Sequence, residues 1–576
     1  MKKSKLNKIK EIERPWIEYY NDKNKANIAY PEGNLMDVLE ETADKYPNYY
    51  AYQFFNKNVT YSTLVSKIKS VAAALVAHGV KKGDKVTICM PNTPEGIASV
   101  YAVNMIGAIG NMIHPLSSIN EIETYLNISE SKFVITIDLV LDKFVELYST
   151  SKLEKVIYVS PSEDMSKVMQ SLYYIKSGRK VKAPKNNPNI ISWKKFMSSR
   201  RVFDESFRAN TTKDDPALIL YSGGTTGKPK GILLSNLNLN AVARGSEMMT
   251  DPAKAGDSVL SILPIFHGFG LVVCIHTPLS IGMKCILIPA FKPKEFVSLI
   301  KKYKPNFLAG VPALYESLLS SNFGEKDLEC VTCVISGGDL LTSEVKTKVD
   351  AYLEAHGSKA KVRQGYGLTE GTGASCLTPT HIYKPGTIGI PYPDTYYKIV
   401  KMETHDEAPL GTDGEICISG PMVMMGYYND EAETAQVLRI HEDGRIWLHT
   451  GDIGSMDETG FVFFKQRIKR LIVSSGYNIY PSYIENVLNS HPNVLTSTVI
   501  GIDHPRKGQV AKAFIILKDG TELNDELKKD IKEHCEKNVS KFSLPYEYEF
   551  RESFPKTLVG KVAYRELEEE EKNKNK

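Results

Sequence analysis

The sequence predicts an α/β protein built on parallel, doubly wound sheets. Short, apolar, β-branched runs alternate with longer amphipathic segments through most of the 576 residues. This alternation favours strand–helix–strand units. Buried strands are predicted at residues 85–90, 133–138, 155–160, 217–221, 259–263, 284–288 and 331–336, and helices at 61–78 and 236–249. Because ligands of such folds bind at the carboxyl ends of the strands, the loops that follow them are the first candidates for a functional site.

The composition is typical of a globular protein with several structural units. Lys and Arg number 72 and Asp and Glu 68, so the net charge of +4 gives no overall attraction to nucleic acid. The basic N-terminus lacks the apolar core of a secretory signal. Cys330 and Cys333 lie in an apolar run and are predicted to be buried thiols rather than metal ligands. The expected compartment is the reducing cytoplasm.

Three stretches depart from the regular alternation. Residues 96–120 and 258–283 contain no Asp, Glu, Lys or Arg, and each has the length of a membrane span. However, Pro, His and Gly interrupt both stretches. We interpret both as buried core. Residues 161–212 are polar, with a basic middle and several aromatic side chains. Two interpretations stay open for them: a solvated excursion, or a patch that contacts a membrane surface or a partner. The charged run 568–576 is predicted to be a frayed tail.

A phosphate-binding loop is predicted between the strand at 217–221 and the helix at 236–249. Its sequence, SGGTTGKPKG, occupies residues 222–231. Glycine lets backbone N–H groups turn toward an anion, while hydroxyl and ammonium groups add donors. The predicted nucleotide-binding residues are Ser222, Gly223, Gly224, Thr225, Thr226, Gly227 and Lys228. A Walker A motif is disfavoured, since it requires Gly in place of Ser222 and Ser or Thr in place of Pro229.

Further motifs follow the loop in order: YGLTE at 366–370, TGD at 450–452, Arg467 with Lys469, GYNIYP at 476–481 and PKTLVGK at 555–561. With the loop, they resemble the adenylate-forming superfamily of acyl-CoA synthetases, luciferases and peptide-synthetase adenylation domains, over about residues 35–565. The resemblance implies a large N-terminal AMP-binding domain of doubly wound sheets, residues 1–468, and a small, mobile α+β lid domain, residues 469–576. It also implies two steps. A carboxylate attacks the α-phosphate of ATP, and the thiol of coenzyme A then displaces AMP from the acyl-adenylate.

The resemblance and the chemistry together assign roles to single residues. Lys561 is expected to neutralise charge while two anions combine. Glu370 is the expected Mg²⁺ ligand, since hard cations prefer carboxylate oxygens. Thr369 is expected to donate to the α-phosphate. The other nucleotide- or coenzyme-binding residues are expected to be Gly337, Gly338, Gly365, Tyr366, Gly367, Asp452, Arg467, Lys469 and Gly476.

Within this set, Tyr366 is expected to stack on adenine against a wall formed by Gly337 and Gly338. Asp452 and Arg467 are expected near the ribose, although Asp452 could instead cap a turn. Lys469 occupies the family's hinge position, and Gly476 lies on the segment that lines the pantetheine tunnel in the family.

The acid substrate is predicted to be a medium- or long-chain fatty acid. His267, in PIFHGFG at 264–270, matches the family residue that guards the acyl pocket, with a buried core histidine as the alternative. No carboxylate in 258–283 could pair with an ammonium group, which disfavours amino acids. Two rivals stay open: an acyl-AMP ligase that loads a carrier-protein thiol, and a non-catalytic nucleotide-binding regulator. Weak peripheral contact with a membrane also stays open.

Overall fold

The computed structural model describes residues 12–574, apart from residues 23–25, 177, 179–180, 182–183, 185–186, 223–228, 251–252, 403, 405, 475–476, 542 and 557–561. The chain divides into two compact units. Unit 1 consists of Met1–Tyr397, Cys417–His449 and Thr459–Phe461, and unit 2 of Lys398–Ile416, Thr450–Glu458 and Val462–Lys576. The predicted domain boundary at residue 469 stays a prediction.

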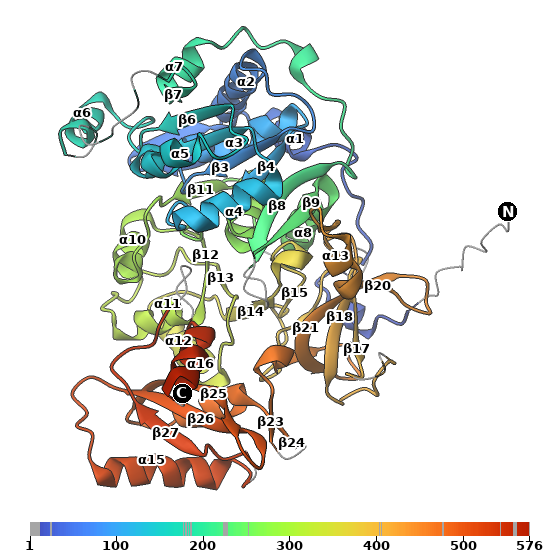
Figure 1. Cartoon of the computed structure of the whole chain (residues 1–576), viewed down its shortest axis with the longest axis vertical. Helices are drawn as coiled ribbons and strands as arrows, with labels where there is room; N and C mark the ends of the chain where they lie inside the picture. Colours follow the sequence, from blue (N-terminus) through green and yellow to red (C-terminus); the bar gives the residue numbers. More distant parts are fainter. Residues whose placement is uncertain are drawn as a thin grey trace, which may run out of the picture. The chain divides into compact units, whose positions relative to one another are not determined.

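Unit 1 contains two large sheets (Figure 1). Among the described residues, the first sheet runs in the order β16 (Ile390–Pro391), β15 (Cys376–Leu377), β14 (Val362–Tyr366), β13 (Cys333–Ser336), β12 (Phe307–Gly310), β10 (Ser258–Ser261), β11 (Lys284–Leu287), β1 (Tyr50–Phe54) and β2 (Lys57–Thr60). The second runs in the order β19 (Gly426–Tyr427), β9 (Lys230–Ser235), β8 (Pro216–Ser222), β4 (Ile109–Met112), β3 (Lys85–Cys89), β5 (Phe133–Ile137), β6 (Lys155–Val159) and β7 (Ile190–Ser192).

The pairing within both sheets follows the predicted fold class. The central neighbours are parallel, as in β10–β12–β13–β14 and β4–β3–β5–β6. Antiparallel pairs occur toward the ends of the sheets, at β1–β2, β14–β15 and β8–β9. Every predicted strand overlaps an observed one. A doubly wound arrangement brings the carboxyl ends of its parallel strands to one edge, which is where the predicted motifs follow β8, β10, β13 and β14.

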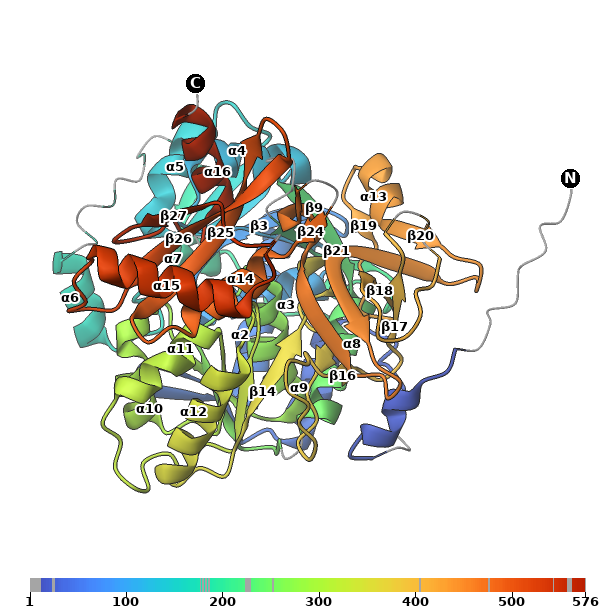
Figure 2. The same ribbon diagram turned by 90° about the horizontal axis from the view of Figure 1, so that it is seen from below.

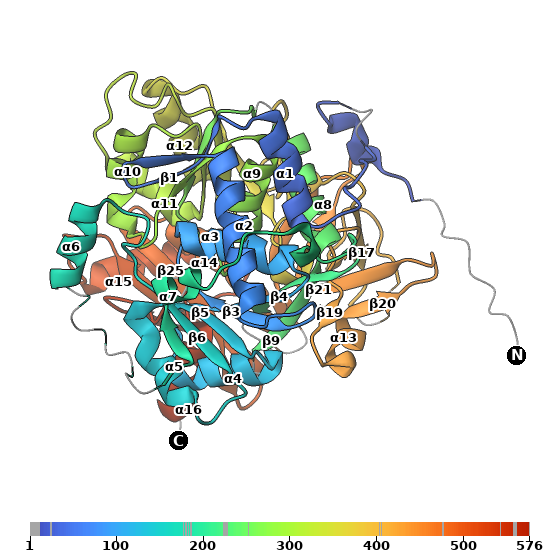
Figure 3. The same cartoon turned by 90° about the horizontal axis from the view of Figure 1, so that it is seen from above.

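The helices of unit 1 include both predicted ones, as α2 and α8. They are α1 (Leu35–Lys45), α2 (Tyr61–Ala77), α3 (Pro94–Met105), α4 (Ile119–Ser129), α5 (Leu141–Leu147), α6 (Lys167–Lys176), α7 (Trp193–Ser198), α8 (Asn236–Met249), α9 (Thr277–Ile281), α10 (Phe296–Tyr303), α11 (Pro312–Glu316), α12 (Ser343–Ala355) and α13 (Glu431–Val437). Figure 3 shows α1, α2 and α3 side by side. All twelve residues of α3 are buried, which explains the first part of the uncharged stretch, residues 96–105. Leu116, near the end of that stretch, is exposed. No described helix has both the length and the apolarity to cross a bilayer.

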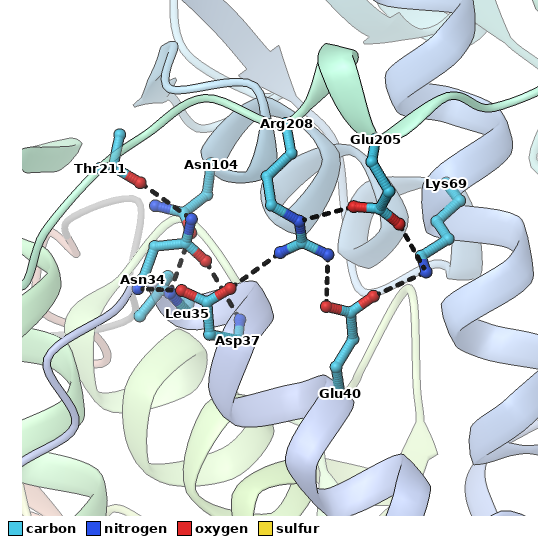
Figure 4. Close-up of polar contacts among 9 residues, drawn as sticks. All are labelled: Asn34, Leu35, Asp37, Glu40, Lys69, Asn104, Glu205, Arg208 and Thr211. Carbon is cyan, nitrogen blue, oxygen red and sulfur yellow. Dashed lines mark hydrogen bonds and ion pairs between the residues drawn. The ribbon is translucent and has the colours of Figure 1, made fainter.

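Part of the stretch 161–212 belongs to the core, so its interpretation as a solvated excursion is wrong there. β7 pairs in parallel with β6, and Trp193 and Phe196 of α7 are buried. The end of the stretch is fixed to α1 and α2 (Figure 4). The guanidinium of Arg208 contacts Asp37 at 2.8 Å, Glu205 at 3.2 Å and also Glu40, which Lys69 contacts at 2.9 Å.

A five-stranded sheet has the order β17 (Tyr396–Val400), β18 (Gly414–Ser419), β21 (Ile446–Met456) and β20 (Leu438–Ile440), with β22 (Val462–Arg467) paired to β21. Another sheet, within unit 2, has the order β24 (Tyr477–Ile479), β23 (Ile472–Ser474), β26 (Gly508–Leu517) and β25 (Val494–His504), with β27 (Glu547–Phe550) paired to β26.

Helices cover both faces of the unit 2 sheet (Figure 2). On one face, α14 (Pro481–Asn489) and α15 (Asp525–Asn538) place Ile484 and Ile531 in a cluster with Val499 and Ala513. On the other face, Leu567 of α16 (Tyr564–Lys574) packs with Ile500 and Phe514. The prediction of a frayed tail is therefore wrong for residues 568–574. Its charged side chains are those of an amphipathic helix, because Leu567 and Glu571, one turn apart, are buried.

Candidate active site

The predicted phosphate loop joins the two strands of a hairpin. Ser222 ends β8 and is the register partner of Lys230 at the start of β9. Gly223, Gly224, Thr225, Thr226, Gly227 and Lys228 lie outside the described residues. No strand was predicted between this loop and the helix at 236–249. β9 was missed, although GILLS at 231–235 has the composition of a short strand.

Glu370 lies beside the end of β8, where the loop of this hairpin begins. The residue belongs to the single-turn 3₁₀ helix Thr369–Gly371, which follows β14. Its Oε1 accepts a hydrogen bond from Ser222 Oγ at 3.1 Å and another from Tyr427 Oη at 3.1 Å. Its backbone oxygen accepts from Met424 N at 2.9 Å. The structure thus brings together two predicted site residues, Ser222 and Glu370, from the ends of β8 and β14.

Tyr427 is a member of this cluster that sequence reasoning missed. It lies in the two-residue strand β19, which pairs with β9. Burial, and secondarily the Glu370 carboxylate, raise the pKa of Tyr427, so its hydroxyl stays protonated and donates. Lys230 forms an ion pair with Glu433 and lies 4.8 Å from the centre of the Tyr427 ring. No motif marks Tyr427 in the sequence, and the contact exists only because β19 pairs with β9.

Glycines bring the backbones of the other motifs of unit 1 close together. A Cβ on Gly337 would lie 3.2 Å from the Phe269 ring and 3.4 Å from the backbone oxygen of Gly365. Gly338 has a φ of +79°, a conformation that side chains disfavour. A Cβ on Gly367 would lie 2.4 Å from the oxygen of Gly373. Between Gly365 and Gly367, Tyr366 is half-buried at the end of β14. The predicted glycine wall and YGLTE motif are therefore adjacent.

The His267 segment packs against the same region. His267 is half-buried, and its Nδ1 accepts from Phe269 N at 3.3 Å. Gly268 meets Gly373, since a Cβ on Gly268 would lie 3.3 Å from the Gly373 Cα. A π-helix, Phe269–His276, follows. Its Gly270 allows no side chain, because a Cβ there would lie 2.1 Å from the oxygen of Pro264. Such wide helical turns are common at functional sites.

Unit 2 holds the other predicted residues. Asp452 on β21 and Arg467 on β22 are register partners, and Arg467 Nε lies 3.6 Å from Asp452 Oδ1. Asp452 is buried, and its N–H donates to Thr450 Oγ1 at 3.1 Å, as in a capped turn. Lys469 lies in the 3₁₀ helix Ile468–Arg470. Gly476 and Lys561 lie outside the described residues.

The arrangement in unit 1 has the chemistry of a nucleotide site. A carboxylate that accepts hydrogen bonds from two hydroxyl groups lies beside Ser222, where a Gly-, Thr- and Lys-rich stretch begins. Carboxylate oxygen is the ligand type that a divalent cation prefers when it accompanies a polyphosphate. Together with the doubly wound sheets and the separate C-terminal unit, these features define a nucleotide-dependent enzyme of two parts.

The chain belongs to the AMP-binding enzyme family. The AMP-binding enzyme domain matches residues 39–428, and the AMP-binding enzyme C-terminal domain matches residues 483–561. The predicted family, fold class and enzyme class, an AMP-forming acid–thiol ligase, are confirmed.

Similar proteins cover the chain almost from end to end. A long-chain-fatty-acid–CoA ligase of Bacillus subtilis (strain 168) is 33% identical over 97% of this chain and 99% of its own. One of the same name from Haemophilus influenzae is 29% identical over 97% and 99%. The crystal structure of an ATP-bound RpMatB-BxBclM chimera has a TM-score of 0.82 and 25% identity over 95% of this chain and 100% of its own. These similarities favour neither a carrier-protein-loading ligase nor a non-catalytic regulator.

Proposed function

We propose that the enzyme is a long-chain-fatty-acid–CoA ligase. The carboxylate of the acid attacks the α-phosphate of ATP, which gives the acyl-adenylate and releases pyrophosphate. The thiol of coenzyme A then attacks the acyl carbon and releases AMP. The observation that carries the proposal is the 33% identity to the Bacillus subtilis ligase of that name along nearly the whole of both chains. The cluster of Ser222, Glu370 and Tyr427 at the phosphate loop supports it.

Glu370 is the proposed Mg²⁺ ligand. Among the described residues, both hydrogen bonds to its carboxylate reach Oε1, so Oε2 can accept a cation. The two hydroxyl donors fix the orientation of the carboxylate. A bound Mg²⁺ would neutralise charge on the phosphates of ATP and on the departing pyrophosphate. Coordination by a hard carboxylate oxygen beside a phosphate loop is consistent with this metal rather than with zinc.

The other predicted residues keep their roles as proposals. In unit 1, Thr369 donates to the α-phosphate and Tyr366 stacks on adenine, while glycine at 337, 338, 365 and 367 permits close approach of the nucleotide. The loop residues Gly223 to Lys228 bind the β- and γ-phosphates. In unit 2, Asp452 and Arg467 bind the ribose. Lys561 neutralises charge in the first step, Lys469 is the hinge of the lid, and Gly476 lines the pantetheine tunnel.

The segment around His267 is the proposed entrance of the acyl pocket. It belongs to the stretch 258–283, which contains no Asp, Glu, Lys or Arg. His276, at the end of the π-helix, bonds to Tyr101 Oη and Asn240 Oδ1, both at 2.9 Å. Burial lowers the pKa of His276 to about 3, so this histidine is neutral. Such surroundings favour an uncharged hydrocarbon chain over an ionic substrate.

Pyrophosphate release tests the proposal. The rate is measured with Mg·ATP and fatty acids of increasing chain length, with and without coenzyme A, and acyl-CoA is assayed as product. We expect the highest kcat/KM with long-chain acids and acyl-CoA formation only with coenzyme A. A preference for an aromatic acid such as 4-coumarate, or adenylate formation without any acyl-CoA, would contradict the proposal. Long-chain acids partition into membranes, so we further propose that the enzyme works at a membrane surface.

A further inference from the structure

Helix α6 exposes its apolar side chains. Val168, Met169, Leu172 and Ile175 have exposed fractions of 69%, 44%, 55% and 60%. At helical spacing these four lie on one face. Figures 1 and 3 show α6 at the margin of unit 1, away from the helices that cover the sheets. A helix of a globular protein normally turns such a face toward the core.

The polar side of α6 holds it to the protein instead. Tyr173 Oη donates to Asp138 Oδ1 at 2.9 Å. Gln170 Nε2 donates to the backbone oxygens of Glu163 at 3.0 Å and Met165 at 3.1 Å. Burial raises the pKa of Asp138 to about 6, so this carboxylate is ionised at neutral pH and accepts a charge-assisted bond. The orientation of the helix, apolar face outward, is therefore fixed by specific contacts.

The chain around α6 is strongly basic. Residues 166–203 contain ten Lys and Arg and no Asp or Glu. The positive charge of this stretch therefore exceeds the net charge of +4 of the whole protein. Lys194 and Lys195 of α7 are exposed. Each basic residue near an anionic lipid surface contributes about 1 kcal/mol of attraction. An exposed apolar helix within such a stretch has the two properties that hold a peripheral protein on a bilayer.

We propose that α6 inserts its apolar face into the headgroup region of an anionic bilayer, while exposed basic side chains of the same stretch, such as Lys167, Lys194 and Lys195, contact lipid phosphates. The proposal deepens the proposed function, because an acid dissolved in the bilayer would then meet the enzyme at the membrane. A second copy of the chain fits less well, since a symmetric contact would bring two basic stretches together. A protein partner would gain little from a single ten-residue helix, as stable interfaces bury about 800 Å² on each side.

Vesicle sedimentation with the full chain tests this. The probes are phosphatidylcholine vesicles with and without phosphatidylglycerol, at low and high salt and without substrate. We expect binding to the anionic vesicles, weakened at high salt, and little binding to the neutral ones. The double variant Leu172→Ser/Ile175→Ser should bind at least about tenfold more weakly. The control Leu410→Ser/Ile440→Ser removes two exposed apolar side chains elsewhere and should bind within about twofold of the native protein.

Pyrophosphate release with a water-soluble acid shows that both variants are folded, and it separates the two proposals. If the native protein released no pyrophosphate, the proposed function would be contradicted, but the result of the vesicle experiment would still hold. Equal vesicle binding by the α6 variant and the native protein would overturn the membrane proposal. So would self-association that the α6 variant abolishes, or α6-dependent binding to an acidic protein without binding to vesicles.

Discussion

At the scale of single residues, the Glu370 carboxylate is the centre of the site in unit 1. It receives hydroxyl donors from Ser222 at the phosphate loop and from Tyr427 on β19. Ser222 and Glu370 could be predicted, because each lies in a motif that follows a buried strand. Tyr427 could not, because its contact depends on the pairing of β19 with β9. The amide of glutamine keeps an oxygen that accepts from both hydroxyls but lacks the negative charge. Glu370→Gln therefore separates the hydrogen bonds of Glu370 from its proposed role as a metal ligand.

We expect Glu370→Gln to lower kcat/KM for ATP by about 10²–10³-fold with little change in thermal stability, since loss of a charged metal ligand removes transition-state stabilisation. Pyrophosphate release at increasing Mg²⁺ measures it. The control is Glu431→Gln on the exposed start of α13, which should change the rate less than about twofold. Similar losses in both variants would remove the basis for a metal-ligand role.

Glu95, buried in the first turn of α3, gives the protein a pH-dependent stability. Burial raises its pKa from 4.5 to about 8. The folded chain keeps a proton that the unfolded chain releases above pH 4.5, so the free energy of unfolding falls as pH rises from 4.5 toward 8. We expect Glu95→Gln to raise Tm by about 1 °C near pH 8.5, since a gain of about 1 kcal/mol in the free energy of unfolding shifts the Tm of so large a protein little, and to leave Tm unchanged near pH 4. Calorimetry at both pH values checks this, and an equal shift at both would contradict the assignment.

At the scale of elements, hydrophobic pattern was enough for the buried strands but not for the pieces between them. The central strands are apolar runs because helices cover both faces of their sheets. β9 and β7 were missed because each is a short strand beside polar residues, and only pairing with β8 and β6 stabilises it. α16 was missed because it, too, is stabilised by contacts with segments distant in the sequence. Its charges look solvated in the sequence, yet a tertiary ion pair buries one of them.

That ion pair joins α16 to the sheet of unit 2. Lys512 on β26 contacts Glu571 at 2.6 Å, Glu549 at 3.0 Å and Glu547 at 3.1 Å. Although burial opposes it, these carboxylates raise the pKa of Lys512. Although burial would raise it, hydrogen bonds from Lys512, Arg551 and Lys574 lower the pKa of Glu549 to about 2. The contribution of this carboxylate to stability is therefore full above pH 4.5 and is lost as pH falls toward 2.

We expect Lys512→Met to destabilise unit 2 by about 3 kcal/mol, because it removes the one described cation that contacts all three carboxylates and leaves only Arg551 and Lys574 to offset their charge. Glu571→Gln should cost only about 1 kcal/mol, since Lys512 keeps two partners. Hydrogen exchange of the β26 amides measures both. Lys528→Met, which removes an exposed pair with Asp525, should cost less than about 0.5 kcal/mol. A larger cost for Glu571→Gln than for Lys512→Met would contradict the explanation.

At the scale of the whole molecule, the proposed sites for the nucleotide and for charge neutralisation come from different units. The sequence motifs indicated which residues take part, because each motif is local. How the units are arranged in each step could not be predicted, since it depends on weak contacts between surfaces rather than on local pattern. Half-reactions measured separately are the direct approach to this question.

Lys561→Ala should slow pyrophosphate release by about 10²-fold or more while thiolysis of supplied acyl-adenylate by coenzyme A stays near the native rate. The reason is that only the first step joins two anions. The described residues Lys556 and Val562 form a β-bridge on either side of residues 557–561, and this bridge does not depend on the Lys561 side chain, so the fold should be kept. Equal losses in both half-reactions would argue against a role confined to adenylation.

Lys469→Pro tests the proposed hinge. Proline fixes φ, so it should restrict a rotation between the two steps. We expect thioester formation to fall by at least about tenfold more than adenylation. The matched substitution Lys465→Pro, on β22 four residues earlier, alters the backbone of the strand and should impair both steps alike. Native rates of acyl-CoA formation in Lys469→Pro would exclude this hinge.

The tight turn at Gly270 has an evolutionary consequence. Any side chain there would collide with the backbone of Pro264, so selection for a new acid cannot act through this position. Gly373 is restricted as well, since a Cβ there would lie 2.7 Å from the carbonyl carbon of Gly268. At this proposed entrance of the acyl pocket, changes in chain-length preference are therefore expected at neighbouring positions that carry side chains, such as Leu271 and Val272 of the π-helix. Divergent descendants of this enzyme should keep the backbone of the turn and vary around it.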